Sequence, residues 1–77
     1  MLKELVEYLA KNLVENPDAV SVEAIEDEKM TTLRLKVAQS DLGRVIGKQG
    51  RNVTAMRTVL HAAAAKSGRR TNLEILD

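Results

Sequence analysis

The centre of this 77-residue sequence is the segment GRVIGKQGRNV, residues 43–53. Two glycines, Gly47 and Gly50, enclose two polar residues, and glycine can adopt positive φ and let another backbone approach because it has no Cβ. Three cations lie within eight residues, with no carboxylate among them: Arg44, Lys48 and Arg51. This glycine-containing loop precedes the N-terminus of a predicted helix. A loop at that position suits a phosphate group, because free N–H groups and the helix dipole both favour an anion.

The length and composition limit the classes of protein to consider. The length allows one domain, and a chain of this size buries only about 60% of its unfolded surface, so a partner that adds buried area would stabilise it. The absence of cysteine excludes disulfides and thiolate metal sites and fits a reducing compartment. No apolar run approaches the roughly 20 residues of a membrane span, and the start of the chain does not resemble a signal peptide. We therefore expect no membrane partner.

Charge is distributed unevenly along the chain. Residues 1–42 hold five Lys/Arg and nine Asp/Glu, a net charge of −4, whereas residues 43–77 hold seven Lys/Arg and two Asp/Glu, a net charge of +5. The basic half begins at the glycine-containing segment, which favours a polyanionic partner. Two solvated faces of a small domain are the alternative reading, and charge alone does not separate the two.

Hydrophobic periodicity in the N-terminal half predicts a helix and two strands. Leu2–Leu13 shows helical spacing over about four turns, and the Asn-Pro-Asp sequence at residues 16–18 is expected to end that helix. Residues 20–24 alternate as a strand, with a bulge or the strand end expected at Ile25. Residues 31–37 alternate more clearly, and the short charged link between the two strands predicts antiparallel pairing.

The C-terminal half predicts two helices and a last strand. Ser40 or Asp41 is expected to cap a short helix that Gly47 ends. The apolar stripe of this short helix is Leu42, Val45 and Ile46. The apolar face expected for the next helix is Val53, Met56, Leu60, Ala63 and Ala64. Ser67-Gly68 closes that helix and residues 71–76 alternate as a strand, so the complete order is α-β-β-α-α-β.

The spacing of the glycines argues against two common phosphate-binding motifs. The dinucleotide fingerprint requires G-x-G-x-x-G directly after a strand, whereas here a short helix precedes the loop. The P-loop requires four residues between its glycines, followed by Lys-Ser/Thr. Gly43 and Gly47 are separated by three residues, and Gln49 occupies the position of the magnesium-binding hydroxyl.

No arrangement of residues predicts catalysis. His61 is the only histidine, and no carboxylate or nucleophile accompanies it in a recognisable pattern. Ser/His/Asp, Cys/His and paired-carboxylate signatures do not appear. We therefore expect a protein that is not an enzyme and that uses no metal or cofactor.

The motif that fits is the KH module, whose GXXG loop clamps about four nucleotides by their backbone. Residues 45–53 resemble its signature: a hydrophobic pair, GxxG, two variable residues and a further hydrophobic residue. The helix and strand that precede this core resemble the type II, prokaryotic arrangement, an α+β fold with three helices packed on one face of a three-stranded sheet. We expect a single KH domain over residues 1–77, with an N-terminal extension at 1–28 and a core motif at 30–77 that contains the GxxG loop, 47–50.

The resemblance narrows to one family. Residues 40–51, 56–58 and 73–76 resemble the KhpA (YlqC) family of small bacterial single-KH RNA-binding proteins, and the similarity covers nearly the whole chain, residues 16–18 included. It implies a cytoplasmic protein that acts as an RNA chaperone or post-transcriptional regulator. It also implies a homodimer, a larger KH-domain-containing RNA-binding protein as a second partner, and a link to cell elongation, cell shape and cell-wall biogenesis.

On this resemblance we expect single-stranded RNA to bind at the GxxG loop. Lys48 and Gln49 would contact phosphates, Arg44 and Arg51 would flank the path, and Asn52 and Arg57 would reach a sugar or base edge. The complete set of candidate RNA-binding residues is Arg44, Ile46, Gly47, Lys48, Gln49, Gly50, Arg51, Asn52 and Arg57. An apolar floor for the bases would come from Leu42, Ile46 and Val53, for which core packing is the alternative.

The aromatic content sets limits on the mode of binding. Tyr8 is the only aromatic residue, whereas modules that stack bases need aromatic side chains on the binding face. This argues against RRM and OB-type readers and predicts modest affinity with weak sequence preference. A dimerising scaffold domain with secondary RNA binding is the alternative function, supported by the small core and by the alanine run at 62–65, which could admit a close helix neighbour.

Overall fold

The computed structural model describes residues 1–76 and confirms the α+β class and the order α-β-β-α-α-β, with short 3₁₀ turns between the main elements. Asp77, the last residue of the expected domain, lies outside the described residues. The helices and strands are α1 (Leu2–Lys11), β1 (Ser21–Glu26), β2 (Met30–Lys36), α2 (Leu42–Ile46), α3 (Arg51–Ala64) and β3 (Arg70–Leu76).

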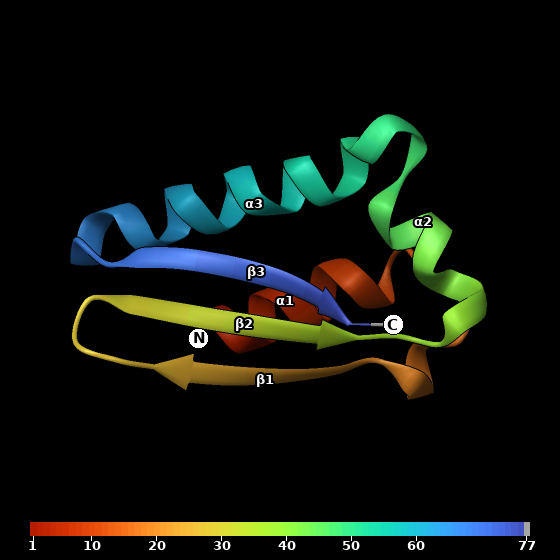
Figure 1. Ribbon diagram of the computed structural model, residues 1–77, viewed down its shortest axis with the longest axis horizontal. Coiled ribbons are helices and arrows are strands. Elements are labelled where there is room, and N and C mark those ends of the chain that lie inside the picture. Colours follow the sequence, from red (N-terminus) through yellow and green to blue (C-terminus); the bar gives the residue numbers. More distant parts are fainter. Residues whose placement is uncertain (77) are drawn as a thin grey trace.

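The three strands form one mixed sheet in the order β1-β2-β3. β1 is antiparallel to β2, with Val22 opposite Leu35, and β2 is parallel to β3, with Leu33 opposite Leu73. In Figure 1, α1 lies behind the sheet, α3 runs alongside β3, and α2 lies beyond the ends of β2 and β3. The connection from α2 to α3 therefore lies at one end of the molecule.

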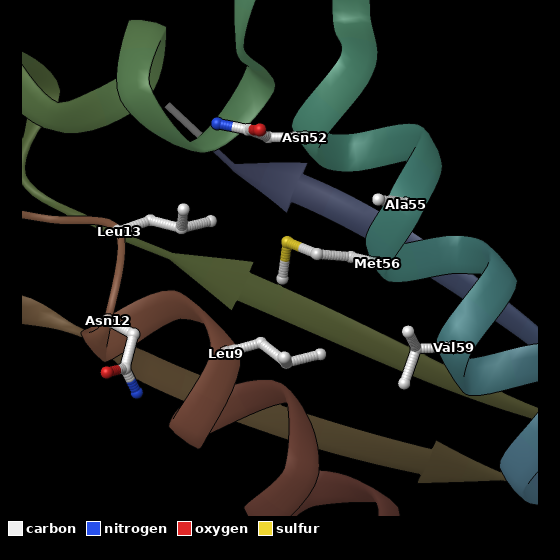
Figure 2. Close-up of a pocket in the computed structure, with 7 residues that line it drawn as sticks. All are labelled: Leu9, Asn12, Leu13, Asn52, Ala55, Met56 and Val59. Carbon is white, nitrogen blue, oxygen red and sulfur yellow. The ribbon is translucent and has the colours of Figure 1, made fainter.

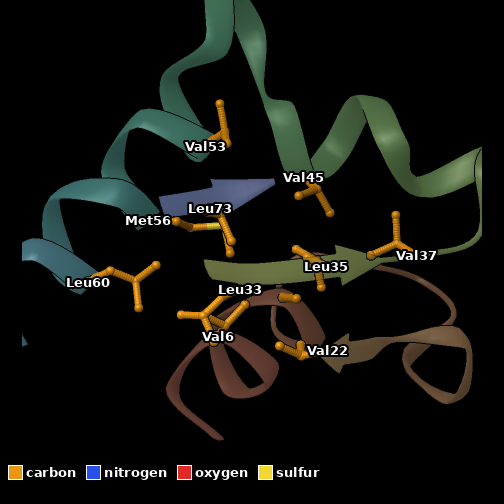
Figure 3. Close-up of a cluster of buried hydrophobic side chains, with 11 residues drawn as sticks. Val6, Val22, Leu33, Leu35, Val37, Val45, Val53, Met56, Leu60 and Leu73 are labelled. Atoms are coloured by element: carbon orange, nitrogen blue, oxygen red, sulfur yellow. The ribbon is translucent and has the colours of Figure 1, made fainter. Parts of the chain in front are cut away.

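A single hydrophobic core holds the helices to the covered face of the sheet. Leu33 and Leu35 of β2 are fully buried at its centre, as is Val6 of α1. Figure 3 shows Met56 and Leu60 of α3 and Leu73 of β3 converging on them, with Val45 of α2 at the edge of the cluster. Burying a side chain of this size contributes about 1.5–3 kcal/mol. Because Val45 is fully buried, the short helix α2 is fixed to the core.

At Ile25 the sequence predicts a bulge or the end of the strand; the bulge is wrong, and the strand ends one residue later, at Glu26. β1 continues in regular register to Glu26, which lies opposite Thr31, and Ile25 lies opposite Thr32. Ile25 is 45% exposed on the open face of the sheet. Successive side chains of a strand point to opposite faces, so an apolar residue out of phase with Val22 is turned toward solvent while the strand stays regular.

Two details of the helices also differ from the sequence-based expectation. α1 ends at Lys11, several residues before Pro17, and a turn follows in which the N–H groups of Leu13 and Val14 both donate to the carbonyl of Ala10. The proline therefore follows the turn and does not itself end the helix.

On α3, Ala63 and Ala64 were both expected on the buried face, but Ala63 is exposed and only Ala64 is buried. A rotation of about 100° per residue moves neighbouring positions onto different faces.

Candidate nucleic-acid interface

The corner between α2 and α3, Gly47–Gly50, is built almost entirely from left-handed backbone. Gly47 has φ 78° and ψ 168°, Gln49 has φ 57° and Gly50 has φ 76°. The Gly47 N–H donates to the Gly43 carbonyl over 2.8 Å, and the Gly50 N–H donates to the Gly47 carbonyl over 3.0 Å. α2 therefore ends at Gly47, as predicted, and the chain reverses within four residues into α3.

Gly47 is required for two separate reasons. Its φ and ψ lie in a region that is essentially accessible only to glycine. A Cβ at this position would also lie 2.7 Å from Asn52 Cγ and 2.8 Å from the Asn52 nitrogen. Gly50, in contrast, has open space around the position of a Cβ, so only its left-handed conformation favours glycine there.

The side chain of Asn52 closes the corner from inside. Its Nδ2 donates to the Arg44 carbonyl over 2.7 Å, which satisfies one of the carbonyls left free at the end of α2. Asn52 is the second residue of α3, so this bond joins the two helices across Gly47. The sequence-based expectation was that Asn52 reaches a nucleotide, and in this structure its amide group is engaged with the backbone of α2.

The cations at the corner divide into free and paired groups. Lys48 and Arg51 are exposed, and no carboxylate of residues 1–76 lies within ion-pair distance of either. Arg44 pairs with Glu15, its Nε lies 3.9 Å from Asp41 Oδ1, and its side chain is 53% exposed. The N-terminus of α3 has no side-chain cap. Two exposed cations therefore lie beside a helix N-terminus without a side-chain cap, where the Gly50 and Arg51 N–H groups donate to the Gly47 and Lys48 carbonyls.

The three residues expected to form an apolar floor lie in different environments. Ile46 is 40% exposed beside the corner, whereas Val53 is only 8% exposed and belongs to the core cluster. Leu42 is half-buried and packs against that cluster. Ile46 therefore supplies most of the apolar surface that a ligand at the corner could contact.

Asp41 anchors α2 from its other end. Its side chain is buried and does not cap α2, contrary to the expectation for Ser40 or Asp41. Asp41 Oδ1 accepts the N–H of Glu15 over 3.1 Å, and Oδ2 accepts the N–H and Nδ2 of Asn16 over 3.1 and 3.0 Å. The donors lie about 25 residues earlier in the chain, so local sequence patterns do not reveal the contact. The Glu15 N–H and the Asn16 donors lower the pKa of Asp41.

Two arginines of the basic half are engaged by the fold. Arg57 Nη2 donates to the Leu73 carbonyl over 3.1 Å and so ties α3 to β3. Arg69 Nη2 donates to the carbonyls of Asp27 and Met30, and its Nε donates to Thr31 Oγ1. Arg69, which the sequence-based analysis did not single out, therefore fixes the β1–β2 hairpin to the turn before β3.

The rest of residues 1–76 offers few other features that bear on function. Within residues 1–76 no group of three or more His, Cys, Asp or Glu side chains is arranged to hold a metal ion. His61 is exposed on α3. No helix in this part of the chain is both long enough and apolar enough to cross a membrane.

The parallel β2 and β3 strands, joined through two helices with a GxxG corner between them, define a type II KH fold. A family model described as "KhpA/KhpB, KH domain" matches residues 3–75, and the chain belongs to this family. The RNA-binding protein KhpA of Borreliella burgdorferi is 53% identical, over 96% of this chain and 90% of that protein. The RNA-binding protein KhpA of Aquifex aeolicus is 51% identical, over 99% of this chain and 96% of that protein.

A solved structure shares the same fold at lower sequence identity. Era of Aquifex aeolicus, in a complex with GDP and AlF4−, superposes with a TM-score of 0.64 and 20% identity. The match covers 96% of this chain and 29% of the Era chain. At this identity the similarity establishes the fold alone.

The two glycines of the corner should respond differently to substitution. Gly50→Ala should cost about 1–2 kcal/mol, the penalty of a left-handed conformation for a residue with a Cβ. Gly47→Ala should cost clearly more, because it adds a contact with Asn52 to the backbone penalty. Urea unfolding followed by circular dichroism measures both, and equal losses would contradict the proposed packing of Asn52 under Gly47.

The Asp41 anchor should make stability depend on acid pH. Since its pKa is lowered from the ordinary value of 3.8, the ionised group stabilises the fold above that value, and the contribution is lost as the pH falls through the folded-state pKa. The Asp41→Asn variant should be less stable than the parent protein at pH 7. It should also lose less stability than the parent when the pH is lowered. The pKa of Asp27 is also lowered, because the N–H groups of Lys29 and Met30 donate to its carboxylate. Its contribution to stability is therefore also lost as the pH falls, so Asp27→Asn is the matched comparison.

Proposed function

We propose that this protein binds single-stranded RNA, with phosphates at the Gly47–Gly50 corner and bases over Ile46. The observation that carries the proposal is the exposed corner itself, in which left-handed backbone, the exposed cations Lys48 and Arg51, and the start of α3 without a side-chain cap lie together. Relatives named RNA-binding protein KhpA, about half identical over nearly the whole chain, support the same activity.

The corner suits a phosphate backbone because Gly50 has open space where a side chain would lie and because the corner precedes a helix N-terminus without a side-chain cap. Backbone N–H groups at a helix N-terminus bind anions and need no specific base. Lys48 and Arg51 add long-range attraction, so affinity should fall as salt rises, with a slope of about −0.7 per phosphate contacted on a single strand. Binding of this kind has weak sequence preference.

Other candidate residues contribute to RNA binding around the corner or hold the corner in place. Arg44 holds Glu15, and its side chain is 53% exposed, so it can still face a passing phosphate. Gln49 is exposed at the tip of the corner and can bond a phosphate oxygen. Asn52 contributes by holding α2 to α3, and Arg57 lies farther along α3, with part of its guanidinium group used by Leu73.

The wider roles proposed for this protein rest on family membership. We propose an RNA chaperone or post-transcriptional regulator in the cytoplasm that acts together with a larger KH-domain protein and affects cell elongation and cell-wall biogenesis. Crosslinking in cells followed by sequencing of the bound RNA is the direct test of this assignment.

Replacing the tip of the corner should abolish most RNA binding. Lys48→Asp with Gln49→Asp removes a cation and adds two carboxylates where phosphates would lie, and affinity should fall about tenfold or more. Lys3→Asp with Ser21→Asp is the control, because it makes the same change in net charge at exposed positions on α1 and β1. Fluorescence anisotropy with a labelled unstructured RNA gives the affinities, and circular dichroism checks folding. Parental affinity in a folded corner variant would rule out the corner as the binding site.

A second candidate function, a dimerising scaffold, is favoured by a groove between α1 and α3. Figure 2 shows Leu9 of α1 and Leu13 of the turn after it facing Met56 and Val59 of α3 across the groove. The groove has a volume of about 220 Å³, and its other lining residues are Asn12, Asn52 and Ala55. Val59 is 41% exposed and Tyr8, on α1, is 67% exposed. We propose that a second copy of the chain covers this surface.

A charge placed in the groove should separate the two copies. Val59→Asp should convert a dimer to a monomer, because a buried unpaired carboxylate is costly. Ile25→Asp is the matched control, since Ile25 is similarly exposed but lies on the open face of the sheet. Light scattering across a range of protein concentrations measures the change. A parent protein that is monomeric throughout would exclude the dimer.

A further inference from the structure

An ion pair beside the corner joins the two oppositely charged halves of the chain. Arg44 is on α2, three residues before Gly47, and Glu15 is on the connection between α1 and β1. Arg44 Nη2 contacts Glu15 Oε1, and both side chains are more than half exposed. A carboxylate of the acidic half therefore holds a cation of the basic half, next to the place where phosphates are proposed to bind.

The fold fixes the position of Glu15. Its N–H donates to Asp41 Oδ1 over 3.1 Å, and the N–H and Nδ2 of Asn16 donate to Asp41 Oδ2. Asp41 is buried at the turn that leads into α2. The α1–β1 connection is thereby held at the same end of the molecule as α2 (Figure 1). The Glu15 carboxylate is therefore kept within reach of Arg44.

The carboxylates occupy donors of Arg44 that a phosphate would use. A guanidinium group binds a carboxylate or a phosphate most strongly through two parallel N–H···O bonds. Arg44 Nη2 is taken by Glu15, and Nε lies 3.9 Å from Asp41 Oδ1. Nε and Nη2 form one of the two-donor edges of the group, and both already face carboxylates. A phosphate that takes this edge must displace Glu15.

The ion pair is weak enough for RNA to break it. Ion pairs between exposed side chains favour the paired state by about two- to fivefold. A polyanion that is already held at the corner presents its next phosphate at a high local concentration. Competition from Glu15 should therefore reduce the affinity for RNA by a small factor and leave binding possible.

We propose that Glu15 is an internal competitor of RNA, which holds Arg44 in the free protein and is displaced when a phosphate binds. The proposal rests on the proposed function and adds a residue of the acidic half to the binding site. It makes the affinity of the corner lower than its cations would give alone. It also makes Arg44 a phosphate contact that forms only when RNA displaces Glu15.

Glu15→Gln tests the competition, because it removes the carboxylate and keeps the backbone N–H that Asp41 accepts. The variant should bind a labelled unstructured RNA about two- to fivefold more tightly than the parent protein at the same salt concentration. Arg44 then adds about one phosphate contact, so the slope of log affinity against log salt should steepen by about 0.7. Fluorescence anisotropy over a range of salt concentrations measures both effects, and circular dichroism checks folding.

Two further variants separate competition for Arg44 from a general change in charge. Asp18→Asn removes one carboxylate from an exposed position on the same connection, where the side chain has no ion pair within residues 1–76. It should change the affinity much less than Glu15→Gln does. Arg44→Gln removes the cation for which Glu15 competes. In the Arg44→Gln background, Glu15→Gln should therefore have no larger effect than Asp18→Asn.

The contrary results are equally definite. Unchanged or weaker binding by Glu15→Gln, or a gain no larger than that of Asp18→Asn, overturns the competition while binding at the corner stands. A gain that persists in full in the Arg44→Gln background also overturns it, because Glu15 would then repel RNA without competing for Arg44. A parent protein that binds no RNA overturns the proposed function and the competition together.

Discussion

The hydrogen bond from Asn52 to the Arg44 carbonyl is the constraint on which the rest of this molecule's surface depends. It draws the start of α3 against the end of α2 and leaves no room for a Cβ at Gly47. The backbone between the helices must then pass through left-handed conformations. As a consequence the tip of the corner, Lys48 and Gln49, projects away from the core into solvent.

The corner is held rigidly because α2 is fixed from several sides. Val45 binds it to the core, and the buried Asp41 carboxylate binds the turn before it to the α1–β1 connection. The Arg44–Glu15 pair extends this connection along the surface. These contacts use one of the cations near the corner and leave Lys48 and Arg51 unpaired among the described residues, so the positive field is concentrated where a polyanion would approach.

Several features could be predicted because each depends on a local pattern. Period-2 alternation at residues 31–37 located β2, and the glycine spacing located the corner. The predictions of a bulge at Ile25 and of a buried Ala63 were wrong because an apolar side chain was assumed to be buried, although roughly 55–60% of a folded protein's accessible surface is apolar. The role of Asp41 was missed because its partners are distant in sequence.

The sequence by itself determined the order of the elements, the family and the place of the corner, since periodicity, glycine and local charge act over a few residues. The tertiary structure decided which polar groups remain available to a ligand. Asn52, Arg57 and Arg44 look equivalent to Lys48 as residues of the sequence, yet the fold engages the first three and leaves Lys48 exposed. The reason is that a side chain's availability depends on the carbonyls and carboxylates that packing brings beside it, and those come from distant parts of the chain.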